Sequence, residues 1–270
     1  DLPTDRFTAY GLVLPADVTR WLPFLYQTGG TLLDATGAPA LDPIVATQAI
    51  STYVELVTEG PAVEPVYLET GWGGEALGIG RVGMAIEGNW TIPYLAQEHP
   101  SIPWGVAPLP AGPAGTATLA FSTCWAVAAG AGAGQEAAVA LLGQLSSPGA
   151  QLDRMGTTAA MPARPSLADA WRNRYPELAP FLDGLASARL WQLPVELANL
   201  PRFVNRELRA VLDGDLTAAE AQAEIRARME AMLAATDCEG RGGIELTDIG
   251  KIADFQRTPV AGAKDDTSAD

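Results

Sequence analysis

An indole ring and an amide lie next to each other in the sequence at Trp90 and Asn89. The preceding segment 82–86 carries apolar residues at every second position, which is typical of a strand with one buried face. Gly88 then turns the chain, so Trp90 is expected at the carboxyl edge of a sheet, where open α/β sheets bind ligands. A flat apolar ring beside an amide suits a sugar, which has an apolar C–H face and a rim of hydroxyls.

Other chemistries find little support in the residue types. His99 is the single histidine of the sequence, and no serine or cysteine nucleophile motif accompanies it, so a catalytic triad is not expected. Cys124 and Cys238 lie too far apart for a zinc or redox motif. A disulfide between these two cysteines and a pair of buried free thiols both remain open.

The elements that must position Trp90 alternate between helix and strand, which predicts an α/β fold. Asp42 and Pro43 combine a capping carboxylate with a proline at the first helical position, so a helix begins there. The other expected elements are helices over 135–145, from a cap at Asn199 to Gly214 and from a capping box at Thr217 and Glu220 to about 235, with strands over 82–86, 102–107 and 119–127.

Composition and charge restrict the class of partner. The 270 residues are 48% hydrophobic and 18% charged, which indicates a globular chain. The formal charge is −15, because 32 acidic side chains face 17 basic ones, and such a surface repels nucleic-acid phosphates and anionic lipid. The uncharged stretch between His99 and Gln135 contains several prolines and glycines, so it is not expected to span a membrane.

The order of four local patterns resembles the extracytoplasmic solute-binding proteins of sugar ABC importers, the group that includes maltose-binding protein. The four patterns are the aromatic helix that ends at Gly29-Gly30 before Leu32-Leu33-Asp34, the helix at 43–59, the block from Gly80 to Trp90, and the segment 121–127. The resemblance extends over about residues 10–235. It implies a type II periplasmic-binding-protein fold, α/β in class, of which this chain is mainly the second, C-terminal lobe of a two-lobed clamshell.

The resemblance also implies which residues contact the ligand. Trp72 is a further candidate, because the glycines at 71, 73 and 74 are expected to leave its ring uncovered. The ligand-contact residues implied by the resemblance are Trp21, Asn89, Trp90, Phe121, Ser122, Thr123, Asn199 and Arg202.

The domain boundaries follow from the same resemblance. Residues 1–124 and 161–235 are expected to form the second lobe, and 125–160 to contain the hinge crossing and a remnant of the first lobe. Most of the family's first lobe precedes the region where this chain starts. The apolar face of the 125–160 segment is therefore expected to need a cover, either a first lobe or a second chain.

The acidic tail over 236–270 has a pattern similar to a dockerin-type or EF-type calcium loop. The candidate metal ligands are Asp237, Glu239, Glu245 and Asp248. Arg241 occupies the fifth position, where a ligand oxygen belongs, so we expect a degenerate loop. We expect no cofactor, since Arg241 disfavours the calcium binding that this loop pattern would otherwise allow.

The function implied by the resemblance is non-catalytic binding of a mono- or oligosaccharide, which is then delivered to ABC permease subunits outside the cytoplasm. One alternative is a secreted glycoside hydrolase, with Glu69, Glu75 and Glu87 as the acids near the aromatic positions. Another is a secreted interaction module whose tail docks a partner.

Overall fold

Parallel strands joined by helices form the framework of the chain. The computed structural model describes residues 10–128, 130 and 132–237. Its strands are β1 (Tyr10–Val13), β2 (Ala62–Val63), β3 (Val82–Ala85), β4 (Thr118–Ala120) and β5 (Ala188–Leu190). Its α-helices are α1 (Val18–Gln27), α2 (Pro43–Thr58), α3 (Gly73–Gly78), α4 (Thr91–Glu98), α5 (Gln135–Leu145), α6 (Pro148–Thr158), α7 (Ala168–Arg174), α8 (Ala179–Asp183), α9 (Leu200–Leu212) and α10 (Ala218–Asp237).

The strands form two small parallel sheets. β1 lies between β2 and β3, with Leu12 opposite both Ala62 and Met84. β4 pairs with β5, so that Ala120 lies opposite Leu190. Parallel neighbours require crossover connections, and helices α1 and α2 provide one between β1 and β2, while α3 lies between β2 and β3. The predicted α/β class is confirmed.

Three details of the predicted strands were wrong. Residues 102–107 form no strand, because Pro103 offers no N–H to a ladder and no neighbour pairs with this segment. The strand expected over 119–127 ends at Ala120, since its partner β5 is only three residues long. In β3, Val82 packs in a small core with Val13 and Ala76, whereas Met84 lies outside this core and is exposed.

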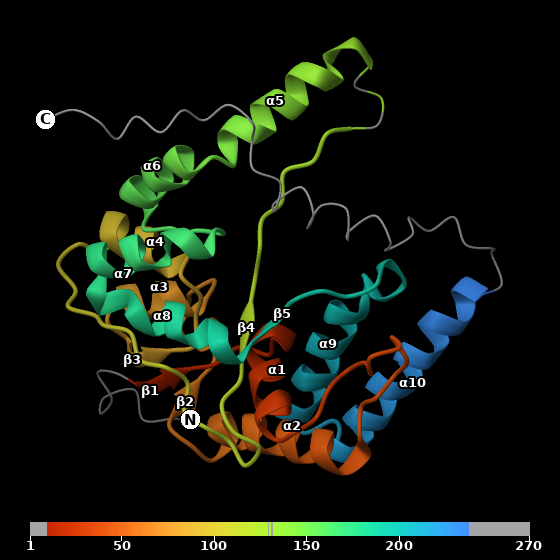
Figure 1. Cartoon of the computed structure of the whole chain (residues 1–270). Helices are drawn as coiled ribbons and strands as arrows, with labels where there is room; N and C mark the ends of the chain where they lie inside the picture. Colours follow the sequence, from red (N-terminus) through yellow and green to blue (C-terminus); the bar gives the residue numbers. More distant parts are fainter. Residues whose placement is uncertain (1–9, 129, 131, 238–270) are drawn as a thin grey trace, which may run out of the picture.

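The largest core lies between α1, α2, α9 and α10, which gather on one side of the molecule (Figure 1). Trp21 and Tyr53 are its largest fully buried side chains, and the Tyr53 hydroxyl donates to the carbonyl oxygen of Pro15 at 2.5 Å. The buried Glu64 pairs with Arg209 of α9, with Nη1 2.5 Å from Oε2. Leu12 of β1 packs against this core, so the core contacts the first sheet.

The predicted helix signals at both ends of this core are confirmed. The Asp42 carboxylate accepts the backbone N–H groups of residues 44 and 45 at 2.9 Å, with Pro43 at the first helical position. Gly214 ends α9 with φ +79, a conformation that favours glycine. Thr217 and Glu220 form the predicted capping box of α10, with Thr217 N–H donating to Glu220 at 2.8 Å and Glu220 N–H to Thr217 Oγ1 at 3.2 Å.

Helix α5 projects from the rest of the molecule (Figure 1). None of its side chains is buried, and Val139, Leu141 and Leu145 are exposed. The segment from Phe121 to Ala128 leads to it as extended chain without a sheet partner among the described residues. No helix among the described residues combines the length and apolarity that a bilayer crossing needs.

Candidate functional site

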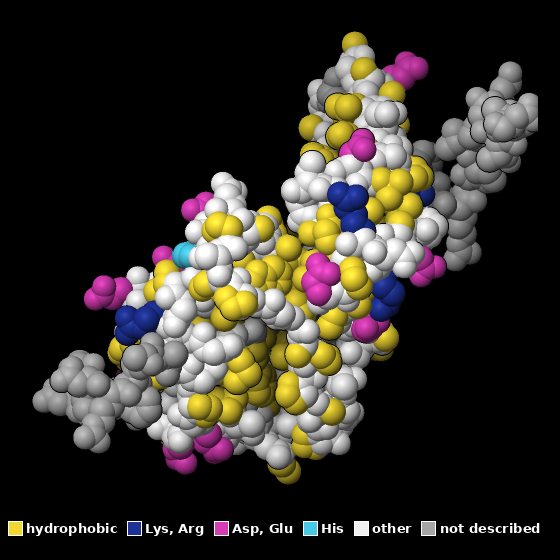
Figure 2. All heavy atoms as spheres, turned by 90° about the vertical axis from the view of Figure 1, so that its left-hand side faces the viewer, with side chains coloured by type: hydrophobic (Ala, Val, Ile, Leu, Met, Phe, Trp, Pro, Cys, Tyr) yellow, Lys and Arg dark blue, Asp and Glu magenta, His cyan; other side chains and the backbone are white. Residues whose placement is uncertain are grey.

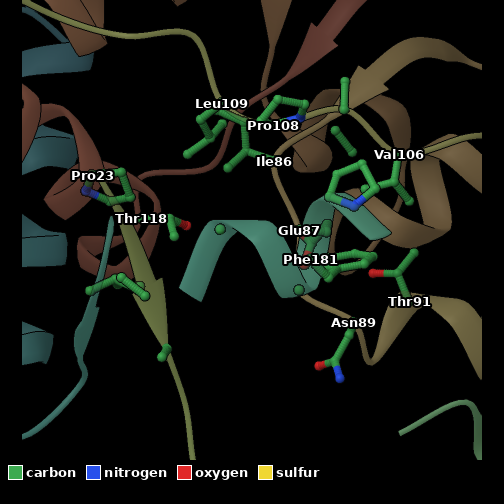
Figure 3. A pocket seen from close by; sticks show the side chains of 18 of the residues that line it. Pro23, Ile86, Glu87, Asn89, Thr91, Val106, Pro108, Leu109, Thr118 and Phe181 are labelled. Carbon is green, nitrogen blue, oxygen red and sulfur yellow. The ribbon is translucent and has the colours of Figure 1, made fainter. Parts of the chain in front are cut away.

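A cavity of about 400 Å³ opens where β3 ends and α4 begins. Its walls come from the 86–92 turn, the irregular segment 104–109, β4, and the region of α8. Asn89, Thr91 and Phe181 lie on one side of this cavity, and Pro23 and Thr118 lie on the opposite side (Figure 3). Hydrophobic side chains gather along the centre of one face of the molecule (Figure 2). The residues that line the cavity are mostly apolar, with a few polar groups among them.

Two aromatic rings meet at the rim of the cavity. Trp90 is 40% exposed and Phe121 is 45% exposed, and both line the cavity. Their ring centroids are 5.4 Å apart at an interplanar angle of 77°, an edge-to-face arrangement. Trp191 lies 6.5 Å from Phe121 and extends the aromatic surface beyond the cavity lining. Large exposed rings of this kind offer apolar area to a ligand.

Polar groups accompany these rings. Asn89 lines the cavity beside Trp90. Thr91 also lines the cavity, but its Oγ1 is buried away from the cavity surface and has no hydrogen-bond partner among the described residues. A buried hydroxyl without a partner is energetically costly, so we treat it as a cost to stability and not as a ligand contact.

A buried ion pair lies beneath the rings. Arg20 Nη2 lies 2.5 Å from Glu87 Oε2, and the Glu87 side chain is only 6% exposed. Burial raises the pKa of the Glu87 carboxyl, and the positive charge of Arg20 opposes this rise. Trp90 Nε1 also donates to Glu87 Oε2, at 3.1 Å. One carboxylate oxygen, Oε2, therefore accepts from both Arg20 and Trp90.

The structure places the predicted ligand residues in three groups. Asn89, Trp90 and Phe121 come together at the cavity, as expected. Trp21 was predicted wrongly: it is 0% exposed and packs in the main core, because α1 turns its apolar face towards α2 and α9. Trp72 does not line the cavity, and its ring packs edge to face on Tyr94 with centroids 4.9 Å apart.

The glycines near Trp72 have the opposite effect to the one predicted. A Cβ at Gly74 would lie 2.1 Å from the Trp72 ring, so this glycine lets the ring pack against the helix rather than leaving it open. The remaining predicted contacts, which lie outside the cavity lining and are exposed, are Ser122, Thr123, Asn199 and Arg202. Asn199 precedes α9, but its side chain makes no capping hydrogen bond.

Some cavity residues were missed by sequence reasoning. Arg20 and Thr91 are adjacent to predicted positions, but neither belongs to a motif that marks it as functional. Phe181 and Asp183 belong to α8, far along the chain from Trp90. Only tertiary packing brings these residues together, so no sequence signal identifies them.

The predicted calcium loop lies mostly outside the described residues. Asp237 ends α10, whereas Glu239, Glu245 and Asp248 fall in the undescribed part 238–270, as does Cys238. Cys124 is exposed on the extended segment. Within the described ranges, no group of three or more His, Cys, Asp or Glu side chains could hold a metal ion.

The family model of bacterial extracellular solute-binding proteins matches residues 5–180. The chain belongs to this family. Among curated proteins, none matches the chain significantly. Its resemblance to the family, stated above from four local patterns, is thereby confirmed.

Three solved structures illustrate the similarity of this fold to known proteins. The GacH receptor of Streptomyces glaucescens, solved unliganded and with acarbose, has a TM-score of 0.70 at 23% identity, with 84% of this chain and 60% of that one covered. The sugar-binding protein MalE from Xanthomonas citri has a TM-score of 0.69 at 20% identity, covering 87% and 61%. The maltodextrin-binding MalE domain from Bdellovibrio bacteriovorus, bound to maltotriose, has a TM-score of 0.67 at 18% identity, covering 87% and 63%.

These similarities confirm the solute-binding fold. The chain spans about 60% of the length of these structures. Identities this low show that the fold is shared. The ligand of this solute-binding protein must be argued from its own site residues.

Proposed function

We propose that this solute-binding protein binds a carbohydrate without transforming it. The observation that carries the proposal is the edge-to-face pair of half-exposed rings, Trp90 and Phe121, at a cavity that also presents Asn89. The C–H face of a pyranose packs on an aromatic ring, and its hydroxyls pair with amide and hydroxyl groups. The sugars named with the neighbouring structures agree with this chemistry.

The carboxylates of the site support binding rather than hydrolysis. A glycosidase needs two carboxyl groups facing each other across the scissile bond. Of the three acids considered, Glu69 and Glu75 do not line the cavity, and Glu87 is held by Arg20 and Trp90. Asp183, which does line it, pairs with Arg172 at 2.6 Å. These engagements leave no evident general acid among the described residues.

The wider role proposed is delivery of the sugar to the permease subunits of an ABC importer, outside the cytoplasm. The family's extracellular character supports this location. The exposed apolar side chains of α5, which are Val139, Leu141 and Leu145, would be covered by further protein, either a first lobe or a second chain.

Isothermal titration calorimetry tests the binding proposal. We expect the 270-residue chain to bind at least one of maltose, maltotriose and acarbose. Trp90→Ala should weaken that binding about tenfold, because an aromatic stacking surface is lost. Trp125→Ala is the matched control, since Trp125 is also exposed, at 55%, but does not line the cavity. Absence of binding to every sugar, or equal weakening by both variants, would contradict the proposal.

A further inference from the structure

The indole N–H of Trp90 already has a partner within the protein. Its Nε1 donates to Glu87 Oε2 at 3.1 Å, while the ring remains 40% exposed at the cavity rim. A ligand can therefore reach the face of the ring but finds its polar atom occupied. The ring therefore offers the ligand an apolar surface, and its hydrogen bond to Glu87 fixes its orientation.

Glu87 is fixed by groups from two helices, α1 and α3. Its Oε2 is 2.5 Å from Arg20 Nη2 on α1. Its Oε1 lies against Gly73 of α3, where a Cβ would approach to 2.8 Å. A buried carboxylate held by a charged partner is costly to move, because breaking the pair leaves a buried charge uncompensated. Glu87 is thus a rigid acceptor for the indole.

Arg20 is itself held in one orientation. Its Nε donates to the backbone carbonyl oxygen of Ile86 at 3.0 Å, and its Nη1 donates to Thr19 Oγ1 at 2.7 Å. Its Cζ lies 5.6 Å from the centroid of the Trp90 ring, within the range of a cation–π interaction. The same guanidinium therefore contacts both the carboxylate and the ring that this carboxylate orients.

The turn between them is shaped for the ring. A Cβ at Gly88 would lie 2.3 Å from Trp90 Cζ3, so the indole packs directly on the backbone of residue 88. Any larger residue at this position would displace the ring. Backbone contact, ion pair and hydrogen bond together define one orientation of Trp90.

We propose that Arg20 and Glu87 are positioning residues, which hold the Trp90 indole as a fixed stacking surface and keep its N–H away from the ligand. The orientation of the ring is a property of the unliganded protein. The consequence for sugar binding rests on the proposed function: the sugar contacts Trp90 through a C–H face, and its hydroxyls pair with other groups of the cavity.

The indole N–H resonance of Trp90 in ¹H–¹⁵N NMR spectra tests the positioning directly, without ligand. Loss of one signal in Trp90→Phe of the full chain identifies this resonance. Glu87→Ala should shift it and increase its hydrogen exchange rate about tenfold or more, because the acceptor is gone. Glu87→Gln retains an acceptor oxygen and should give an intermediate result, which keeps the test valid if Glu87→Ala fails to fold.

Glu64→Gln is the matched control, because Glu64 is an equally buried partner of an arginine but does not line the cavity. It should leave the Trp90 resonance unchanged. An unchanged resonance in both Glu87 variants, or an equal change in Glu64→Gln, would overturn the proposal.

Titration with maltotriose separates this proposal from the proposed function. In the wild type, the hydrogen exchange of the Trp90 indole N–H should be as slow in the complex as in the free protein. Glu87→Gln should lower the affinity for maltotriose about threefold. A Trp90 N–H that exchanges its Glu87 bond for a ligand bond would overturn the inference while leaving sugar binding intact. Absence of binding to maltotriose and the other sugars would contradict only the proposed function, since the ligand-free NMR result stands independently.

Discussion

Phe121 and Trp90 meet edge to face with their ring centroids 5.4 Å apart, although 31 positions separate them in the sequence. Phe121 follows β4, whereas Trp90 follows β3, so the contact joins the two small sheets at the rim of the cavity. Each ring supports the other, and both keep an exposed surface for a ligand.

Replacing Phe121 should reduce sugar affinity in two ways. Phe121→Ala removes stacking area and also leaves Trp90 without its edge-to-face neighbour, a pair worth about 1 kcal/mol. We expect about tenfold weaker binding of the best sugar in calorimetry. Phe121→Tyr keeps the ring and should stay within about twofold of the wild type. Equal affinity of Phe121→Ala and wild type would show that this ring lies outside the sugar site.

Replacing the buried Thr91 hydroxyl should stabilise the protein. Thr91→Val removes a hydroxyl that has no partner among the described residues, so the free energy of unfolding should rise by about 1 kcal/mol. Urea unfolding measures this change, with Thr91→Ser as the variant that keeps the hydroxyl. A destabilised Thr91→Val protein would contradict the assignment of an unpaired hydroxyl.

Breaking the Glu64–Arg209 pair should destabilise the main core. Glu64 is buried, and Arg209 is partly exposed, so solvent moderates the cost. We expect Glu64→Gln to lower the free energy of unfolding by about 2 kcal/mol, because it weakens the interaction with the Arg209 charge. The double variant Glu64→Met/Arg209→Met should lose less, since no charge remains unpaired. A double variant less stable than the single one would contradict this account.

The capping box of α10 should make stability depend on pH. Hydrogen bonds from the Thr217 backbone N–H and hydroxyl lower the pKa of Glu220 below its usual 4.5. A lowered folded-state pKa means that the ionised carboxylate stabilises the fold above pH 4.5, and that this contribution is lost as the pH falls through the lowered pKa. Glu220→Ala should therefore be less stable than the wild type at pH 7, with a smaller difference at pH 3 in urea unfolding.

Glu224→Ala is the control for this pH experiment, because Glu224 lies one turn further along the same helix and outside the box. Its stability difference from the wild type should change less between the two pH values. A gap for Glu220→Ala that widens on acidification would contradict the sign argued here.

The sequence by itself determined the features that depend on neighbouring residues. Asp42-Pro43, Gly214 and the Thr217–Glu220 box mark helix ends because capping bonds span only a few positions. The placement of Trp90 at the carboxyl end of β3 follows similarly from the alternation before it and from the glycine turn. The order of local patterns was sufficient to indicate the family.

Only the tertiary structure decided which aromatic rings are available to a ligand. Trp21 and Trp90 are the same residue type, yet one packs between helices and the other lines the cavity, because burial depends on which distant elements cover each side chain. The Arg20–Glu87 pair likewise depends on distant elements, because 67 positions separate the two residues, and Thr91 belongs to no local motif. Long-range packing, which brings α1, α3 and α8 to the end of β3, adds to the predicted Asn89, Trp90 and Phe121 a set of residues that carry no mark in the sequence.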